Sequence, residues 1–376
     1  MINDCYYDSF DTKENLHFDS KVVHGGLGCD PITGAVSFPI FQTATFRHRT
    51  FDVSTGYNYS RLQNPTRQEL ERTMAILEEG TEAFAFTSGQ AANMCIFGLL
   101  KKGDHVILSD DIYGGTYRIC SDIFSALDCE FTYLDMSDPD QLEAAIRPST
   151  KMLFVETPTN PMMKTADISK LSQIAKKHGV LLVVDNTFLS PYFQKPITQG
   201  ADIVVHSGTK YLCGHNDVIA GIVVVTTQEL ADHFRLQMKS RGNGLAPFDS
   251  WLVLRGLKTL SLRMERHDRN GKKVVEWLKK HPKVKKLYYA GLGGMISFEV
   301  DSVETVHRLL SDVKMILFAE SLGGAETLIT YPLTQTHEST PPDVREKLGI
   351  NERFVRISIG IEDPEDIIAD LEQAMK

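Results

Sequence analysis

Two apolar runs in the middle of the chain end abruptly in polar residues. The first, Leu-Leu-Val-Val over 181–184, runs into Asp185, and the second, Ile-Val-Val over 203–205, runs into His206-Ser207-Gly208-Thr209-Lys210. Short apolar runs rich in β-branched residues are typical of strands that are buried on both faces of a sheet. The pattern therefore predicts two buried strands, one delivering a carboxylate and the other two hydroxyls and an amine.

Short apolar segments alternate with amphipathic ones on either side of these runs. Strands are expected near 105–109, 152–155, 181–184, 202–205 and 221–225. A helix is expected over 67–79, opened by Thr66 and Glu69 in capping-box spacing, and another between Asp167 and Gly179. This alternation predicts an α/β fold with a mostly parallel sheet.

The pattern changes after about residue 240. Met295–Val300 and Phe354–Ile359 alternate like half-buried strands, and a final helix opens at Asp363-Pro364. We therefore expect a smaller α+β domain beside the larger one. The predicted division is an N-terminal arm over 1–50, a large domain over 51–240 and a C-terminal domain over 241–376.

Composition and charge narrow the function classes. A hydrophobic content of 42% with 24% charged residues is ordinary for a globular protein. The net charge of −9 argues against nucleic acid or an anionic membrane as partner, and no apolar run is long enough to span a bilayer. Acidic residues crowd the first twenty positions, which predicts no signal peptide, and six cysteines without Cys-x-x-Cys predict reduced thiols rather than disulfides or a zinc site. A cytoplasmic protein without a metal centre is expected.

The residues after the two strands suit pyridoxal 5'-phosphate. A lysine amine binds this cofactor covalently, a carboxylate keeps its pyridine nitrogen protonated, and hydroxyls bind its phosphate. Each residue has an ordinary alternative, since an acid at a strand end is commonly a helix cap and a lone lysine is usually surface charge. A phosphate-loop motif is absent, because Gly208-Thr209-Lys210 has no Gly-Lys-Ser/Thr and no preceding glycine loop.

An ordered set of segments carries a family resemblance along nearly the whole chain. The segments are Val23–Gly26, Tyr59–Arg61, Asn64–Arg67, Thr87–Gly89, Asp111–Thr116, Glu156–Pro161, Val184–Phe188, His206–Tyr211, Arg255–Leu260 and Ala319–Gly324. The chain resembles the Cys/Met-metabolism enzymes that depend on pyridoxal phosphate, which include cystathionine γ-synthase, cystathionine β- and γ-lyases, methionine γ-lyase and O-acylhomoserine sulfhydrylase. The resemblance implies the fold-type I transferase architecture. It also implies a homotetramer, a dimer of dimers that share active sites.

The resemblance also implies residue roles in cofactor binding. Lys210 would hold the cofactor and shuttle protons, Tyr113 would stack on the ring and assist proton transfer, and Asp185 would pair with the ring nitrogen. The phosphate would be bound by Ser207, Thr209, the backbone N–H groups of Gly89 and Gln90 at a helix start, and Tyr59 and Arg61 from a second subunit. Asn160 would contact both the ring hydroxyl and the substrate.

The substrate side of the site would depend on residues late in the chain. Arg356 would clamp the α-carboxylate, and Glu320 and Ser321 would contact the substrate. An acid at the position of Glu320 is typical of γ-synthases and γ-lyases, although some β-lyases also keep one. Gly114 occupies the position of the reactive cysteine of methionine γ-lyases.

The expected activity is γ-replacement on an O-acylhomoserine by cysteine or sulfide. A short connection between Gly291 and Gly294 is similar to that of bacterial members resembling cystathionine γ-synthase or O-acetylhomoserine thiolyase. The alternative is a cystathionine β- or γ-lyase. Two other classes of protein fit the residues less well. A catalytically inactive binding protein of this fold would be expected to lack Lys210 or Asp185, and both are present. A Schiff-base aldolase would not need Asp185 and the phosphate donors.

Overall fold

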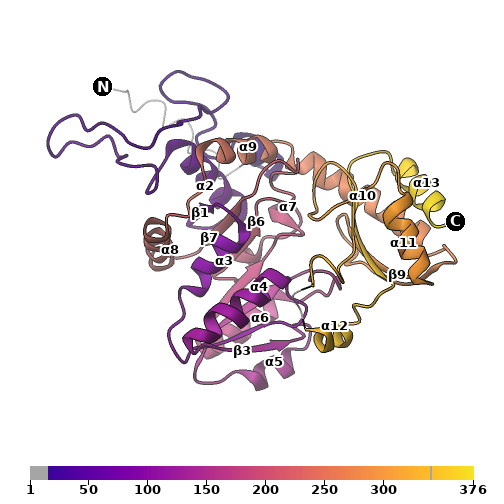
Figure 1. The fold of residues 1–376 in the computed structure, drawn as a ribbon. Helices are drawn as coiled ribbons and strands as arrows, with labels where there is room; N and C mark the ends of the chain where they lie inside the picture. Colours follow the sequence, from indigo (N-terminus) through magenta and orange to yellow (C-terminus); the bar gives the residue numbers. More distant parts are fainter. Residues whose placement is uncertain (1–15, 339–340) are drawn as a thin grey trace.

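A seven-stranded sheet forms the centre of the larger part of the molecule (Figure 1). The computed structural model describes residues 16–338 and 341–376. The strands are β1 (Glu82–Phe86), β2 (His105–Ser109), β3 (Glu130–Leu134), β4 (Thr150–Glu156), β5 (Leu181–Asp185), β6 (Ile203–Ser207) and β7 (Gly221–Val225). Their order is β1-β7-β6-β5-β4-β2-β3, and only β7 is antiparallel to its neighbours. The predicted α/β fold with a mostly parallel sheet is confirmed.

Helices cover both faces of this sheet, which explains why its central strands are largely apolar. The helices of this part are α2 (Pro65–Glu78), α3 (Gly89–Phe97), α4 (Gly114–Arg118), α5 (Pro139–Ala145), α6 (Ile168–His178), α7 (Ser190–Phe193), α8 (Gln228–Arg241) and α9 (Pro247–Leu257). Alternate residues of the central strands enter opposite cores: Val184 and Val204 pack with α2, α6 and α9, whereas Val183 and Val205 pack with α3 and α8.

A second, five-stranded sheet follows in the order β10-β11-β12-β9-β8. Its strands are β8 (Val284–Tyr288), β9 (Met295–Val300), β10 (Leu317–Phe318), β11 (Leu328–Thr330) and β12 (Phe354–Ser358). The accompanying helices are α10 (Leu260–Leu278), α11 (Val303–Asp312), α12 (Pro342–Leu348) and α13 (Pro364–Ala374). Figure 1 shows α10 running from the first part of the molecule to the second.

The expectation that β9 and β12 are half-buried is wrong, because every residue of both strands is buried. Helices α10, α11 and α13 share an apolar core with one face of this sheet. The other face lies against the large sheet's loops, where Ser297 Oγ donates to Pro161 O at 2.7 Å. The polar residues of β9 and β12 therefore face the junction of the two parts rather than solvent.

The capping box expected at the start of α2 is also wrong. Asn64 is the N-cap, and its side chain accepts from Thr66 N at 3.0 Å. Thr66 Oγ1 instead donates to Pro39 O at 2.8 Å, and Glu69 accepts from Leu27 N at 2.8 Å. Both side chains thus hold the preceding segment against α2.

The caps predicted for α6 and α13 are confirmed. Asp167 accepts from Lys170 N at 3.2 Å, and Gly179 ends α6 in the left-handed conformation. Asp363 accepts from Glu365 N at 2.9 Å.

The segment before α2 contains one helix, α1 (Phe18–His24), followed by irregular chain. Figure 1 shows this indigo part looping outward from the body of the molecule. The boundaries of an N-terminal arm over 1–50 stay a prediction, and residues 1–15 of it lie outside the described residues. Across the described ranges, none of the helices combines the length and the apolar character that a membrane crossing requires.

Candidate active site

A cavity of about 260 Å³ opens where the carboxyl ends of β4, β5 and β6 meet the start of α3 and the second sheet. It contains all the predicted site residues except Tyr59 and Arg61. Those that line it are Gly89, Gln90, Tyr113, Asn160, Asp185, Ser207, Thr209, Lys210, Glu320, Ser321 and Arg356. Residues more than 260 positions apart in the sequence, such as Gly89 and Arg356, are thus gathered in one place.

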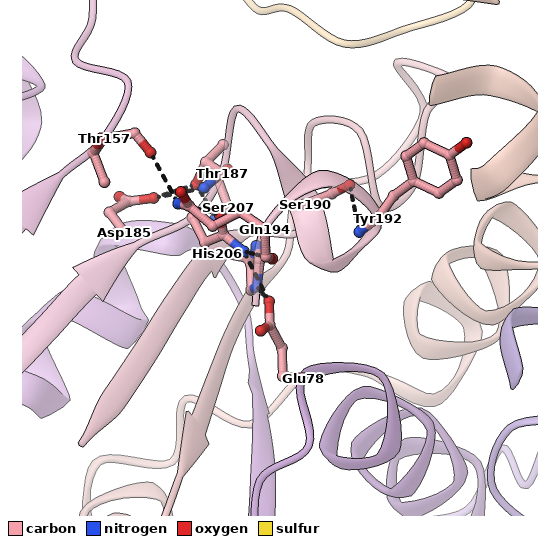
Figure 2. Close-up of polar contacts among 10 residues, drawn as sticks. Glu78, Thr157, Asp185, Thr187, Ser190, Tyr192, Gln194, His206 and Ser207 are labelled. Atoms are coloured by element: carbon pink, nitrogen blue, oxygen red, sulfur yellow. Dashed lines mark hydrogen bonds and ion pairs between the residues drawn. The ribbon is translucent and has the colours of Figure 1, made fainter. Parts of the chain in front are cut away.

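Thr187 ties the ends of β5 and β6 together on the cavity side. Asp185 Oδ1 accepts from Thr187 N at 3.0 Å and from Thr187 Oγ1 at 2.5 Å. The same Oγ1 accepts from Ser207 N at 2.9 Å. Figure 2 shows Asp185, Thr187 and Ser207 grouped at these strand ends. Asp185 and Ser207 are therefore fixed relative to each other.

Asp185 lies in an environment that favours a cationic partner. Burial raises the pKa of its carboxyl, and the hydrogen bonds from Thr187 and the charge of His206 act in the opposite direction. A buried carboxylate is stabilised when a positive charge lies beside it. The protonated ring nitrogen of pyridoxal phosphate is such a charge, so this acid fits the cofactor.

The start of α3 forms an anion-binding corner. Ser88 is the N-cap and accepts from Ala91 N at 3.0 Å. The first N–H groups of a helix have no intrahelical acceptor, and the helix dipole favours an anion there. A Cβ at Gly89 would lie 3.3 Å from the Cβ of Ser207, so a larger residue would crowd the corner. These groups fit the phosphate of the cofactor.

Lys210 projects from the turn after β6 towards the second sheet. Its Nζ donates to Ser321 Oγ at 2.8 Å. The pKa of the amine is lowered to about 8, mainly by burial and also by the charge of Arg356, while the charge of Glu320 opposes both effects. The neutral form of the Lys210 amine is therefore populated far more than that of a surface lysine. Covalent attachment and proton transfer both require this form.

Arg356 reaches the cavity from β12 and is 1% exposed. Its guanidinium donates to Asn160 Oδ1 at 2.8 Å and to Ser321 O at 2.9 Å. Its Nε has no hydrogen-bond partner among the residues that the structure describes. Ser321 has a φ of 97°, a conformation unusual for a residue with a side chain, and thus carries backbone strain at the site. An arginine held in this way can pair with a substrate carboxylate.

Glu156 is a cavity residue that was not predicted from the sequence. It ends β4 opposite Asp185 of β5 and accepts from Tyr113 N at 2.9 Å. Burial and the neighbouring charge of Asp185 raise its pKa well above the usual value. The signal was present, because Glu156 ends the apolar run 152–155 as Asp185 ends 181–184.

Other cavity residues that were not predicted supply walls and further polar groups. They are Ser88, Asn93, Pro158, Thr187, Phe188, Val205, Ile219, Leu322 and Thr336. Thr187 and Phe188 directly follow Asp185, whereas nothing in the local pattern around Asn93 or Ile219 marks them as lining a cavity.

Tyr59 and Arg61 lie outside this cavity. Arg61 Nη1 donates to Lys239 O at 2.7 Å, and its guanidinium carbon lies 5.6 Å from the centroid of the Tyr59 ring. Tyr59 is 44% exposed. Their predicted contact with the phosphate of a second subunit stays a prediction.

A mostly parallel sheet with a half-buried lysine, a half-buried acid and an anion corner at its strand ends defines an enzyme that uses pyridoxal phosphate. Comparison with known proteins agrees: residues 19–376 match the family model described as Cys/Met metabolism PLP-dependent enzyme. The chain belongs to this family, and its cofactor is pyridoxal 5'-phosphate.

Similar proteins carry three related activities. A cystathionine gamma-lyase and a cystathionine gamma-synthase/O-acetylhomoserine (thiol)-lyase, both of Bacillus subtilis, are each 47% identical to this chain. The alignments cover 94% of this chain and 98% of the first, and 96% of this chain and 96% of the second. The crystal structure of a cystathionine gamma-lyase from Lactobacillus plantarum, complexed with L-serine, has 41% identity and a TM-score of 0.93, covering 96% of this chain and 98% of that one. The protein is thus an enzyme of the γ-synthase and lyase type.

Proposed function

We propose that the enzyme catalyses γ-replacement on an O-acylhomoserine. Cysteine or sulfide would displace the acyl group as a carboxylate, giving cystathionine or homocysteine. The observation that carries this proposal is Glu320, whose carboxylate lines the same cavity as Lys210 and Arg356. Arg356 would bind the α-carboxylate of the acylated substrate, and Glu320 would attract the ammonium group of the incoming cysteine.

The proton steps would fall to Lys210 and Tyr113. When bound, the cofactor supplies an electron sink for the electrons left on Cα. Lys210 Nζ would remove the Cα proton and then a Cβ proton, after which the acyl carboxylate leaves Cγ. The thiol sulfur would bond to Cγ as its own proton is lost, and protons would return to Cβ and Cα. Tyr113, which lines the cavity and is 39% exposed, would be the second group able to hold one of these protons.

Cleavage of cystathionine is the second candidate. It is supported by the cystathionine gamma-lyase at 47% identity and by a cystathionine beta-lyase of Lactococcus lactis at 44% identity over 373 residues. Glu320 could attract the distal ammonium of cystathionine as well as that of cysteine. The two reactions differ in the substrate that is consumed.

The proposed assembly is a cytoplasmic homotetramer in which pairs of subunits share active sites. The segment before α2 exposes large apolar side chains, with Phe51 92%, Val36 78% and Ile32 72% exposed. Several large apolar side chains exposed on one segment favour an interface with another chain. A second subunit could bring its Tyr59 and Arg61 to the cavity.

A side-by-side product assay tests the reaction. The purified enzyme is given O-acetyl- or O-succinylhomoserine with cysteine, and separately cystathionine alone. Cystathionine formation with release of the carboxylic acid is expected. Rapid cleavage of cystathionine to homocysteine, pyruvate and ammonia, without consumption of an acylhomoserine, would establish β-lyase activity. Release of cysteine, 2-oxobutyrate and ammonia would instead establish γ-lyase activity.

A further inference from the structure

A buried carboxylate joins β5 and β6 behind the cavity. Glu78, the last residue of α2, accepts from His206 Nε2 at 2.6 Å and from Asn186 Nδ2 at 3.0 Å, both on Oε1. All three residues are fully buried. Figure 2 shows His206 and Glu78 pointing toward each other below the strand ends.

The two donors to Glu78 are chain neighbours of two proposed cofactor ligands. Asn186 follows Asp185, and His206 precedes Ser207. Because successive side chains of a strand point to opposite faces, Ser207 faces the cavity while His206 faces α2. The strand ends are therefore tied twice, by Thr187 on the cavity side and by Glu78 on the far side.

The network extends to the wall of the cavity. Asn186 Nδ2 also donates to Gln194 O at 2.8 Å, and Gln194 Nε2 donates to Asn186 Oδ1 at 3.1 Å. Gln194 Nε2 lies 3.4 Å from Thr157 O, next to the cavity residue Pro158. This one group of side chains therefore makes hydrogen bonds at or next to the ends of β4, β5 and β6.

Fold stability alone does not account for such a cluster. Glu78 Oε2 and His206 Nδ1 have no hydrogen-bond partner in the described part of the chain. Burying a carboxylate is costly, and apolar residues of similar volume often stabilise a core equally well or better. A polar cluster at this place is useful when it fixes the geometry of the groups in front of it.

We propose that Glu78 is a positioning residue for cofactor binding, which holds Asn186 and His206 and thereby sets the spacing between Asp185 and Ser207. The proposal rests on the assignment of Asp185 and Ser207 as cofactor ligands and is independent of which substrate the enzyme uses. It involves no contact between Glu78 and the cofactor.

The test compares cofactor affinity with the stability of the cofactor-free protein. Each variant is stripped of pyridoxal phosphate and titrated with it while absorbance is followed, and its melting temperature is measured without cofactor. Glu78→Gln is expected to raise the dissociation constant about tenfold, since a charge-assisted hydrogen bond that orders the site is lost. His206→Gln, which keeps a donor at the Nε2 position, is expected to stay within about threefold of wild type.

The matched control is Glu299→Gln. Glu299 is another buried acid, 2% exposed, which accepts from Tyr288 Oη at 2.8 Å on the second sheet. This variant should lower the melting temperature and leave the dissociation constant unchanged. An affinity within about twofold of wild type in Glu78→Gln, or an equal loss in Glu299→Gln, overturns the proposal.

Two further variants keep the test decisive. If Glu78→Gln does not fold, Glu78→Asp retains the charge with a shorter reach, and the proposal requires it to weaken cofactor binding at least about threefold. Asp185→Asn and Ser207→Ala are titrated in parallel. Unchanged affinity in both would refute the ligand assignment and the proposal with it, whereas the product assay of the reaction would be unaffected.

Discussion

Lys210 Nζ and Ser321 Oγ lie 2.8 Å apart and connect the two sheets of the molecule. Lys210 follows β6 of the large sheet, and Ser321 lies between β10 and β11 of the second. Ser321 O also accepts from Arg356 of β12. The active site therefore exists only when the two sheets are packed together, and a movement between them would separate the amine from the carboxylate-binding arginine.

Replacing the lysine should abolish both cofactor attachment and turnover. In Lys210→Ala we expect loss of the visible absorption band of the bound cofactor and a fall in kcat of roughly a thousandfold or more, since the group that moves the protons is gone. The surface variant Lys170→Ala, whose side chain is 65% exposed, should behave like wild type. A Lys210→Ala protein that keeps the band would refute the role.

Glu156 and Asp185 should make the cofactor-free protein less stable as pH rises. Both carboxyl groups have raised pKa values in the folded protein, so the folded state holds more protons than the unfolded state above pH about 4. The stabilisation is complete below the unfolded pKa values and is lost as pH rises through the folded ones. Glu156→Gln removes one of these groups, so the free energy of unfolding of wild type minus that of the variant, measured by urea titration, should fall as pH rises above about 5. A difference that stays constant or grows over this range would contradict the argument.

Glu156 should also matter through the hydrogen bond that it accepts from Tyr113 N. Glu156→Gln keeps an oxygen acceptor and a neutral group, so we expect kcat within about threefold of wild type. Glu156→Ala removes the acceptor and should lower kcat about tenfold or more, with the pH profile of kcat altered because Tyr113 is displaced. Equal kcat in both variants would show that the contact has no functional role.

Mixed oligomers test whether Tyr59 and Arg61 act across a subunit boundary. Arg61→Ala and Lys210→Ala each damage a different half of a shared site, so each protein alone should be nearly inactive. Random mixing of the two makes half of the dimers mixed, with one intact site each, and should restore about a quarter of the wild-type activity. If activity does not return after the subunits of the two variants are mixed, Arg61 acts in the same subunit as Lys210.

The parts of the fold that were predicted are those whose environment is set by local sequence. Strands β5 and β6 were found because helices cover both faces, which leaves uninterrupted apolar runs. Strand β12 was predicted, but its burial was not, because Arg356 is covered by Asn160 from a distant part of the chain. The cap of α2 was misread for a similar reason, since Thr66 and Glu69 bind the segment before the helix rather than the helix itself.

The same distinction holds for the site. Asp185 and Ser207 end strands and Lys210 follows one, so all three could be placed at one sheet edge from the pattern alone. The roles of Glu320 and Arg356 came from resemblance, because no local rule links them to residues more than a hundred positions earlier. Glu78 was not singled out at all, since a glutamate at a helix end is ordinarily a surface residue and its burial depends on His206 and Asn186.

Glu320 allows the last prediction, which concerns the choice of thiol. Glu320 lines the same cavity as Lys210, and its charge opposes the effect of burial on the pKa of the amine. Glu320 is exposed, so an ion pair with the ammonium of cysteine should contribute on the order of 1 kcal/mol after screening by solvent, whereas sulfide carries no ammonium. Glu320→Ala should therefore raise KM for cysteine roughly fivefold while changing KM for sulfide less than about twofold.

The measurement is a pair of initial-rate series with one acylhomoserine, in which cysteine or sulfide is varied. Glu346→Ala, at an exposed position of α12, serves as the control and should leave both series unchanged. A parallel loss with both thiols would mean that Glu320 acts on the acylated substrate or on Lys210 rather than on the ammonium of cysteine. Unchanged kinetics with both would remove the observation on which the proposed γ-replacement rests, because the acid in the cavity would then have no part in recognising the second substrate.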